Sequence, residues 1–244
     1  MLPAQAIFIS DAHLSQPGDA NYQRMLAFLG GLADLPGGLP ELFILGDFFA
    51  FWMGFASVPE RYRPVVESLQ QLSATGTRLH FVEGNHDLDL GRFFAHRLGA
   101  TVHPDQAVVT LGGRRLLLAH GDLVDPSDRG YRFLRAALRS LPMKMLSRTV
   151  PPEGVLSIAR RFAENKRYTA SYAAHLPPLF SEYARGQWME GFDGVVLGHC
   201  HHPVFEQEEA VEGRRPRFYV NLGDWIRHFT YLRFDGADFH LERA

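Results

Sequence analysis

The 244-residue chain has one cysteine, almost no net charge and no long apolar run. Cys200 cannot pair within the chain or build a thiolate metal site alone. The 25 Lys and Arg nearly balance 27 Asp and Glu, so no general basic field favours nucleic acid. The longest apolar candidate, 42–56, carries Asp47 and is shorter than the roughly 18 residues of a membrane helix. The first ten residues lack the basic start of a signal peptide. We therefore expect a globular protein of the cytoplasm.

The composition is that of a chain with an ordinary core: 46% hydrophobic and 12% aromatic residues. Its length predicts a single domain over 1–244. Short apolar runs alternate with helical spacing, which indicates an α/β sheet protein. We expect helices over 21–32 and 59–73, and strands over 6–9, 42–45, 78–82, 108–111, 115–119, 194–197, 218–221, 231–234 and 238–241.

The segment 129–167 differs from the rest because it holds ten basic residues and only two acidic ones. Apolar residues such as Leu138 and Leu141 interleave with the charges at helical spacing. We expect a helical insertion between two strands, over 129–185. A solvated helix face is the alternative interpretation.

Five short motifs each follow a predicted strand, at 11–13, 46–47, 84–87, 120–122 and 198–201. Ligands bind at the carboxyl ends of strands in open α/β sheets, so these motifs should converge. Their carboxylates, imidazoles and amide suit Mn²⁺, Fe²⁺ or Zn²⁺ better than Ca²⁺ or a structural zinc. Seven ligands fit two ions that share a carboxylate: Asp11, His13, Asp47, Asn85, His120, His199 and His201.

The spacing within these motifs predicts two local features. In 11–13 and 199–201, ligands two residues apart on extended backbone would point the same way. The glycines Gly46, Gly84 and Gly198 would let the backbone approach closely.

In their order and spacing, the five motifs resemble those of the calcineurin-like metallophosphoesterase superfamily, over nearly the whole chain. The resemblance implies a four-layered α/β/β/α sandwich with two divalent metal ions at the strand ends. It places one ion at Asp11, His13, Asp47 and His201, and the other at Asp47, Asn85, His120 and His199.

Hydrolysis of a phosphoester would follow, because two close ions activate water and neutralise phosphoryl oxygens. His86, next to Asn85, would face the phosphate and stabilise charge or protonate the leaving oxygen, with Asp87 orienting its ring. The alternative is that His86 only makes hydrogen bonds, farther from the phosphate.

A closer resemblance joins 46–52, 120–122, 128–131 and 198–203 to the UDP-2,3-diacylglucosamine pyrophosphatases of lipid A synthesis. It implies Mn²⁺-dependent cleavage to UMP and 2,3-diacylglucosamine 1-phosphate at the inner membrane, with a cap that grips the acyl chains. The substrate contacts that it implies are Asn85, His86, Asp128, Asn165, Lys166 and Thr169. The chain departs from that family at His86, where better-known members have Arg, and at Ala50, where they have Glu.

Two further features favour a lipid-like substrate. Six large apolar residues follow Asp47 and could wall a groove beside the metals or belong to the core: Phe48, Phe49, Phe51, Trp52, Met53 and Phe55. The basic insertion would suit an anionic membrane surface, and Leu138 and Leu141 would grip the acyl chains.

Other functions remain open. The alternatives are another metal-dependent phosphodiesterase or phosphatase, acting on a cyclic nucleotide or phosphomonoester, a nuclease, and a non-catalytic scaffold. A nuclease would need a basic groove, and a scaffold has no need of intact ligands. The oligomeric state is open.

Overall fold

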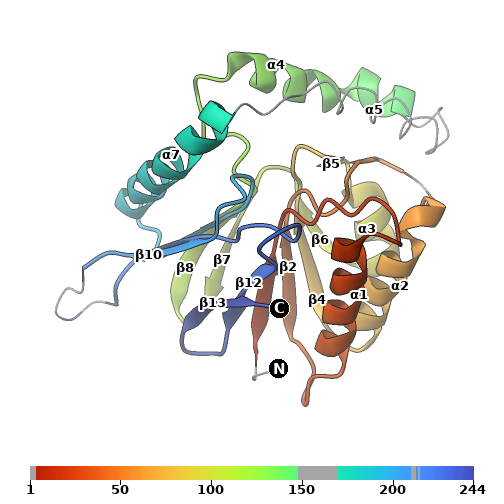
Figure 1. Ribbon diagram of the computed structural model, residues 1–244, viewed down its shortest axis with the longest axis horizontal. Helices are drawn as coiled ribbons and strands as arrows, with labels where there is room; N and C mark the ends of the chain where they lie inside the picture. The colour runs from red at the N-terminus through yellow and green to blue at the C-terminus, as the bar shows by residue number, and fades with distance from the viewer. Residues whose placement is uncertain (1–3, 56, 148–169, 210–212, 214) are drawn as a thin grey trace.

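The computed structural model describes residues 4–55, 57–147, 170–209, 213 and 215–244. Two sheets lie face to face between outer helices (Figure 1). The first sheet has the order β13-β12-β1-β2-β4-β6 and the second β10-β11-β9-β8-β7. Their strands are β1 (Ala6–Ile9), β2 (Glu41–Leu45), β4 (Arg78–Val82), β6 (Thr101–His103), β7 (Gln106–Leu111), β8 (Arg114–Ala119), β9 (Gly194–Leu197), β10 (Val204–Gln207), β11 (Phe218–Asn221), β12 (Thr230–Phe234) and β13 (Phe239–Arg243).

Most central strands are parallel, which brings their carboxyl ends to a common edge. In the first sheet β1, β2, β4 and β6 pair in parallel, and in the second β8, β9 and β11 do so. A two-stranded ribbon, β3 (Trp52–Met53) with β5 (Asp87–Leu88), follows at the ends of β2 and β4. Loops that leave these strands can therefore meet.

The strands alternate between two cores, as a pleated strand buried on both faces requires. On β1, Ile7 and Ile9 face the helices, whereas Phe8 packs between the sheets and stacks on Phe43. The helices α1 (Ala20–Ala33), α2 (Arg63–Ala74) and α3 (Gly91–Leu98) cover the first sheet, and a short 3₁₀ helix, Glu60–Tyr62, precedes α2. On the other side α7 (Ala170–Met189) covers the second sheet. The four-layered sandwich is confirmed.

The helix α7 takes its place from a stripe of apolar residues at every fourth position. Leu176, Phe180, Ala184 and Trp188 are buried against the second sheet. The boundary predicted at residue 185 therefore falls inside a helix that belongs to the sandwich. The predicted substrate contacts Asn165, Lys166 and Thr169 lie outside the described residues.

The apolar residues after Asp47 belong to the core. Phe48, Phe49, Trp52 and Phe55 are each at most 2% exposed, Met53 is buried, and Phe51 packs against them. The rings of Phe49 and Trp52 lie 4.9 Å apart, and Trp52 also packs on rings of α3. The interpretation of this stretch as a groove beside the metals is therefore wrong, because the ribbon that follows β2 turns these side chains beneath the helices.

Two further helices, α4 (Arg129–Leu138) and α5 (Leu141–Ser147), lie across the carboxyl edge of the sandwich (Figure 1). Leu138 and Met143 are partly buried against the core on the helix side of the first sheet. Other apolar side chains point to solvent: Phe133, Leu134, Leu141 and Met145. Leu138 thus packs inward, contrary to its predicted contact with acyl chains, whereas Leu141 is exposed. No helix of the described residues is long and apolar enough to cross a bilayer.

Candidate metal centre

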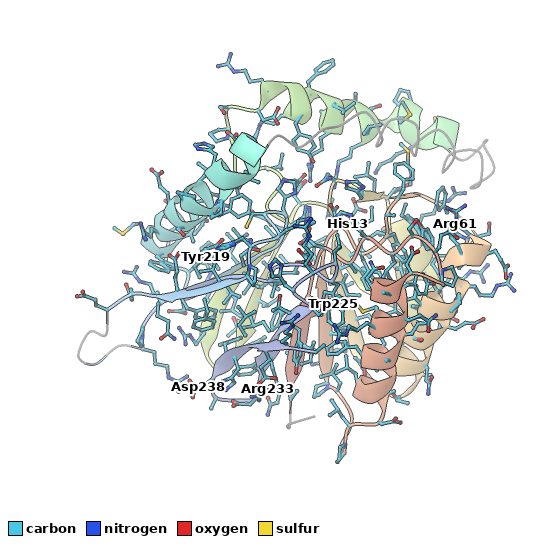
Figure 2. All side chains as sticks on the ribbon, in the orientation of Figure 1. His13, Arg61, Tyr219, Trp225, Arg233 and Asp238 are labelled. Carbon is cyan, nitrogen blue, oxygen red and sulfur yellow. The ribbon has the colours of Figure 1, made fainter. Side chains whose placement is uncertain are left out.

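Loops from five strands bring the seven predicted ligands to the carboxyl edge of the sandwich. Asp11 and His13 follow β1, Asp47 follows β2, and Asn85 follows β4, while His120 and the pair His199 and His201 follow β8 and β9. Figure 2 places His13 at this edge, beneath α4 and α5. Side chains far apart in sequence therefore share one small volume.

One group of ligands contains Asp11, His13 and His201. The Nε2 atoms of His13 and His201 lie 3.3 Å apart. Oδ1 of Asp11 lies 3.3 Å from Nε2 of His201 and 3.9 Å from Nε2 of His13. These three ligand atoms are close enough to bind a single ion.

A second group contains Asp47, His120 and His199, with Asn85 beside it. Nε2 of His120 lies 3.0 Å from Oδ1 of Asn85, 3.2 Å from Nδ1 of His199 and 3.5 Å from Oδ1 of Asp47. Nδ1 of His120 donates to the carbonyl oxygen of Leu45 at 3.0 Å. That bond leaves the Nε2 lone pair of a neutral His120 directed at the other ligands.

Asp47 lies between the two groups. Its Oδ2 is 3.7 Å from Nε2 of His13, and its Oδ1 faces His120. The carboxylate is buried, and the backbone N–H of His86 donates to Oδ1 at 2.9 Å. One oxygen thus faces each group, which is the placement that a bridging ligand needs.

The donor set fits divalent cations. Within the described part of the chain, Oδ1 of Asp11 is buried without a well-aligned hydrogen-bond donor. An unpartnered buried carboxylate oxygen is unfavourable unless a cation or donor binds it. Oδ1 of Asn85 also faces Nε2 of His120, and in a neutral His120 this nitrogen carries no proton because Nδ1 donates to Leu45. Both positions hold electron pairs that a metal ion would use.

The pKa values of the histidines differ in direction. Burial lowers the pKa of both His13 and His199 to about 4, so these rings are neutral and ready to bind a metal. Burial also opposes the charging of His120 and His201, but nearby carboxylates outweigh it. Asp47 raises the pKa of His120 well above its usual value, and Asp11 and Asp224 raise the pKa of His201 to about 10. Without metal, a proton therefore takes the place of a cation in each group.

The ligand loops have an unusual backbone. Asp11, His13, Asp47, His199 and His201 all have φ between 45° and 66°, in the left-handed region. The expectation of extended backbone in 11–13 and 199–201 is therefore wrong. Asp and His enter this region more readily than most non-glycine residues, yet each such residue still stores about 1–3 kcal/mol of strain. The surrounding structure holds them in place.

All three predicted close approaches are present. A Cβ at Gly46, whose φ is +80°, would lie 2.5 Å from Nδ1 of His120. A Cβ at Gly198 would lie 2.5 Å from Oδ2 of Asp11, and one at Gly84 would collide with Oδ1 of Asp47. Without a side chain, the backbone N–H of His199 donates to Oδ2 of Asp11 at 2.8 Å. Glycine is therefore needed where one ligand loop packs on the next.

His86 lies at the open side of the group. Its side chain is 36% exposed, and its Nε2 is 3.9 Å from Oδ2 of Asp47. Its Nδ1 donates to the carbonyl oxygen of Ala50 at 2.9 Å. The free Nε2 is thus directed toward the metal groups and solvent.

Asp87 does not orient this ring, which corrects the prediction. Its buried carboxylate accepts from the backbone N–H groups of Asp47 at 3.0 Å, Phe48 at 2.8 Å and Gly84 at 2.9 Å. Its oxygens therefore turn inward and fasten the loops after β2 and β4 to one another. Asp87 supports Asp47, whereas the Ala50 carbonyl orients His86.

Asp128, a predicted substrate contact, caps α4. Its Oδ1 accepts from the backbone N–H of Tyr131 at 2.8 Å. Sequence reasoning also missed Asp224, whose carboxylate lies behind His201. The signal was present, because Gly223-Asp224 follows a predicted strand just as Gly46-Asp47 does.

Comparison with known proteins agrees with this arrangement. A family model described as calcineurin-like phosphoesterase matches residues 5–203. A UDP-2,3-diacylglucosamine hydrolase of Edwardsiella ictaluri is 32% identical, over 96% of this chain and 90% of that protein. The protein of the same name in Pseudomonas syringae pv. tomato is 31% identical, over 96% of this chain and 94% of that protein. The one in Pseudomonas aeruginosa PA14 is 32% identical, over 94% of each chain. The chain belongs to the calcineurin-like phosphoesterase family, whose members use two metal ions.

Proposed function

We propose that this protein is a dimetal phosphohydrolase that cleaves the pyrophosphate of UDP-2,3-diacylglucosamine to UMP and 2,3-diacylglucosamine 1-phosphate. The observation that carries the proposal is that the strand ends followed by the seven proposed ligands lie beneath α4 and α5, helices that expose apolar residues. The relatives named UDP-2,3-diacylglucosamine hydrolase, which align over nearly all of the chain, support the same substrate.

The proposed ligand sets follow the two groups. Asp11, His13 and His201 would hold one ion, Asn85, His120 and His199 the other, and Asp47 both. When bound, such ions polarise phosphoryl oxygens and activate water for in-line attack on phosphorus. The donors suit Mn²⁺, Fe²⁺ or Zn²⁺, and we propose Mn²⁺.

His86 and Asn85 would contact the phosphate side of the substrate. Nδ1 of His86 donates a hydrogen bond to the Ala50 carbonyl, which leaves Nε2 of His86 available to face the substrate. This exposed nitrogen beside the metal groups suits charge stabilisation or proton donation to the leaving oxygen. Asp128, on the loop that enters α4, could contact the substrate with the oxygen that does not cap the helix.

The helices α4 and α5 would bind the acyl chains. Phe133 is 78% exposed and Leu141 66%, although both lie on helices that cross the ligand edge. Apolar side chains in such a position gain free energy when a lipid covers them. This surface takes over the role that the sequence assigned to the aromatic residues after Asp47.

The same helices would attach the protein to the anionic inner membrane from the cytoplasmic side. Arg129 and Arg132 are exposed on α4 beside the apolar residues. Each basic residue near an anionic surface contributes about 1 kcal/mol to binding. A nucleic acid is not the proposed partner, because the chain has no net positive charge.

Mass spectrometry of lipid that copurifies with the protein, followed by a Mn²⁺-supported assay on UDP-2,3-diacylglucosamine, tests this function. We expect UMP and the acylated sugar phosphate in equal amounts. Absence of turnover with this substrate, despite hydrolysis of bis-p-nitrophenyl phosphate, would contradict the assigned substrate.

The second candidate is a phosphodiesterase or phosphatase for a cyclic nucleotide or phosphomonoester. His86 favours it, because histidine after the motif Asn is the general superfamily pattern. Cyclic AMP offered in the same assay distinguishes the two.

A further inference from the structure

The last residue of β11 and the loop after it, together residues 221–229, supply no proposed metal ligand but contact two loops that do. The side-chain amide of Asn221 donates to the carbonyl oxygen of Gly198 at 2.6 Å. The backbone N–H of Trp225 donates to the carbonyl oxygen of Asp11 at 3.1 Å. This loop therefore fastens the ligand loop of β1 to that of β9.

Within this loop, the carboxylate of Asp224 lies behind the ring of His201. Its Oδ2 is 3.6 Å from Nδ1 of His201 and 3.0 Å from Nδ1 of His228. The opposite ring nitrogen of His201, Nε2, faces Asp11 and His13 at 3.3 Å each. The ring thus has a carboxylate on one side and the proposed ion position on the other.

Asp224 is itself held rigidly. Its side chain is 3% exposed. Its Oδ1 accepts from three successive backbone N–H groups, those of Ile226 at 2.8 Å, Arg227 at 2.6 Å and His228 at 3.1 Å. The orientation of Oδ2 toward His201 is therefore fixed by the turn that follows.

We propose that Asp224 is a positioning residue that prepares His201 to bind metal. An ionised carboxylate only accepts hydrogen bonds, so a ring nitrogen that faces it must carry the proton. With the proton on Nδ1, Nε2 keeps its lone pair for the ion, and a carboxylate behind a ligating histidine is known to fix this tautomer and orientation. The inference rests on the proposed assignment of His201 as a ligand.

The two ion positions can be separated experimentally because different atoms orient their histidines. His120 is oriented by the backbone carbonyl of Leu45, which no side-chain substitution removes. His201 is oriented by a side chain. A change at Asp224 should therefore weaken one ion position and leave the other intact.

The test is Asp224→Asn, titrated with Mn²⁺ by calorimetry in the full chain. An amide oxygen can still accept from the turn, which directs the amide nitrogen toward His201. The amide N–H then donates to Nδ1 of His201, which leaves the ring proton on Nε2. A protonated Nε2 cannot bind the metal ion. We expect one Mn²⁺ to bind with the parent affinity and the other 10–100-fold more weakly, in a protein whose far-ultraviolet circular dichroism shows the parent fold. Asp224→Ser, which also retains an acceptor for the turn, should do the same.

Two controls separate positioning from a general structural effect. His228→Gln removes the other partner of Oδ2 and should leave both affinities unchanged. In a His201→Ala background, Asp224→Asn should have no further effect on Mn²⁺ binding, because the residue acts through His201. A further loss in that background would overturn the proposal.

Other outcomes are equally decisive. Two parent-like affinities in both Asp224 variants would overturn the positioning role alone and leave the proposed function standing. Loss of both ions in both variants would also overturn it. A parent protein that binds fewer than two Mn²⁺ would overturn the ligand assignment and the inference together.

Discussion

Nε of Arg135 on α4 lies 2.7 Å from Oδ2 of Asp122, and both side chains are buried. Arg135 also pairs with Asp105 at 2.8 Å, and Arg139 pairs with Glu83 at 3.0 Å. Two basic residues at the end of α4 are therefore bound to the loops after β4, β6 and β8, so the interpretation as a solvated helix face does not hold for them, whereas Arg129 and Arg132 are exposed. Asp122 lies two residues after His120, so these ion pairs connect α4 to the metal centre.

We expect Arg135→Met to destabilise the protein by about 3–5 kcal/mol, because it leaves the buried carboxylate of Asp122 without its cation. Urea unfolding measures the change. Arg129→Met on the exposed side of α4 is the matched control and should stay within about 0.5 kcal/mol of the parent. Equal effects of the two substitutions would mean that the Arg135–Asp122 pair is effectively solvated.

Asp47→Ala should lose both metal ions and turnover together, because one carboxylate faces both ligand groups. Metal analysis after dialysis gives the stoichiometry. Asp34→Ala, at the exposed end of α1, should keep two ions. Retention of two ions in Asp47→Ala would show that Asp47 does not bridge.

His86→Ala should keep both ions and lower turnover by about 10²–10⁴, the range expected for loss of an acid–base or charge-stabilising group. Metal content and kcat are measured on the same preparation. The exposed His96→Ala on α3 is the control. If His86→Ala instead loses an ion, His86 is a ligand. Its Nε2, 3.9 Å from Oδ2 of Asp47, is close enough for that role.

The double variant Phe133→Ser and Leu141→Ser should reduce kcat/KM for the diacyl substrate more than tenfold. Each side chain fully covered by lipid contributes about 1.5–3 kcal/mol. Cleavage of bis-p-nitrophenyl phosphate should remain near normal, because both side chains are exposed and do not support the core. Met189→Ser, at an equally exposed apolar residue of α7, controls for lost surface hydrophobicity. Equal losses on both substrates would remove α4 and α5 from lipid binding.

Acid stability should depend on Glu242, which joins β13 to β12. Burial opposes its charge, but hydrogen bonds from Arg233 at 2.9 Å and Tyr231 at 2.8 Å lower its pKa below the usual 4.5. The folded state then binds fewer protons than the unfolded state, so this stabilisation is present above pH 4.5 and is lost as the pH falls through the lowered pKa.

Glu242→Gln should therefore unfold more easily than the parent at pH 6, and the difference should shrink below pH 4.5. Urea unfolding with a chelator present measures it, with the exposed Glu67→Gln as control. A difference that stays constant down to pH 3 would show that the ionised form of Glu242 contributes nothing.

Periodicity predicted much of the fold because local and tertiary requirements agree there. The helix predicted over 21–32 spans Ala20–Ala33, with Tyr22, Met25, Leu29 and Leu32 buried. The apolar run 42–45 is a strand buried on both faces. By contrast, the sequence around Phe49 and Trp52 would be the same whether these side chains lined a groove or packed in the core. Only the ribbon that turns them under α2 and α3 decides between the two.

The convergence of the proposed ligands was predictable, but their backbone conformation and their supporting contacts were not. Residue type and position after strands singled out Asp47 and His120. The left-handed backbone of Asp11 and His201 depends on contacts with loops far away in sequence. The place of Asp224 after a predicted strand could have singled it out, but only the fold shows that its carboxylate faces the ring of His201, 23 residues earlier in the chain.

The left-handed backbone of the five proposed ligands sets stability against metal binding. Glycine or asparagine at Asp11, His13, Asp47, His199 or His201 would relieve strain, so selection for thermal resistance alone would favour the loss of ligands. Descendants that no longer need hydrolysis should drift toward sturdier folds without metal. A laboratory programme to stabilise the enzyme should therefore exclude these five positions from its libraries.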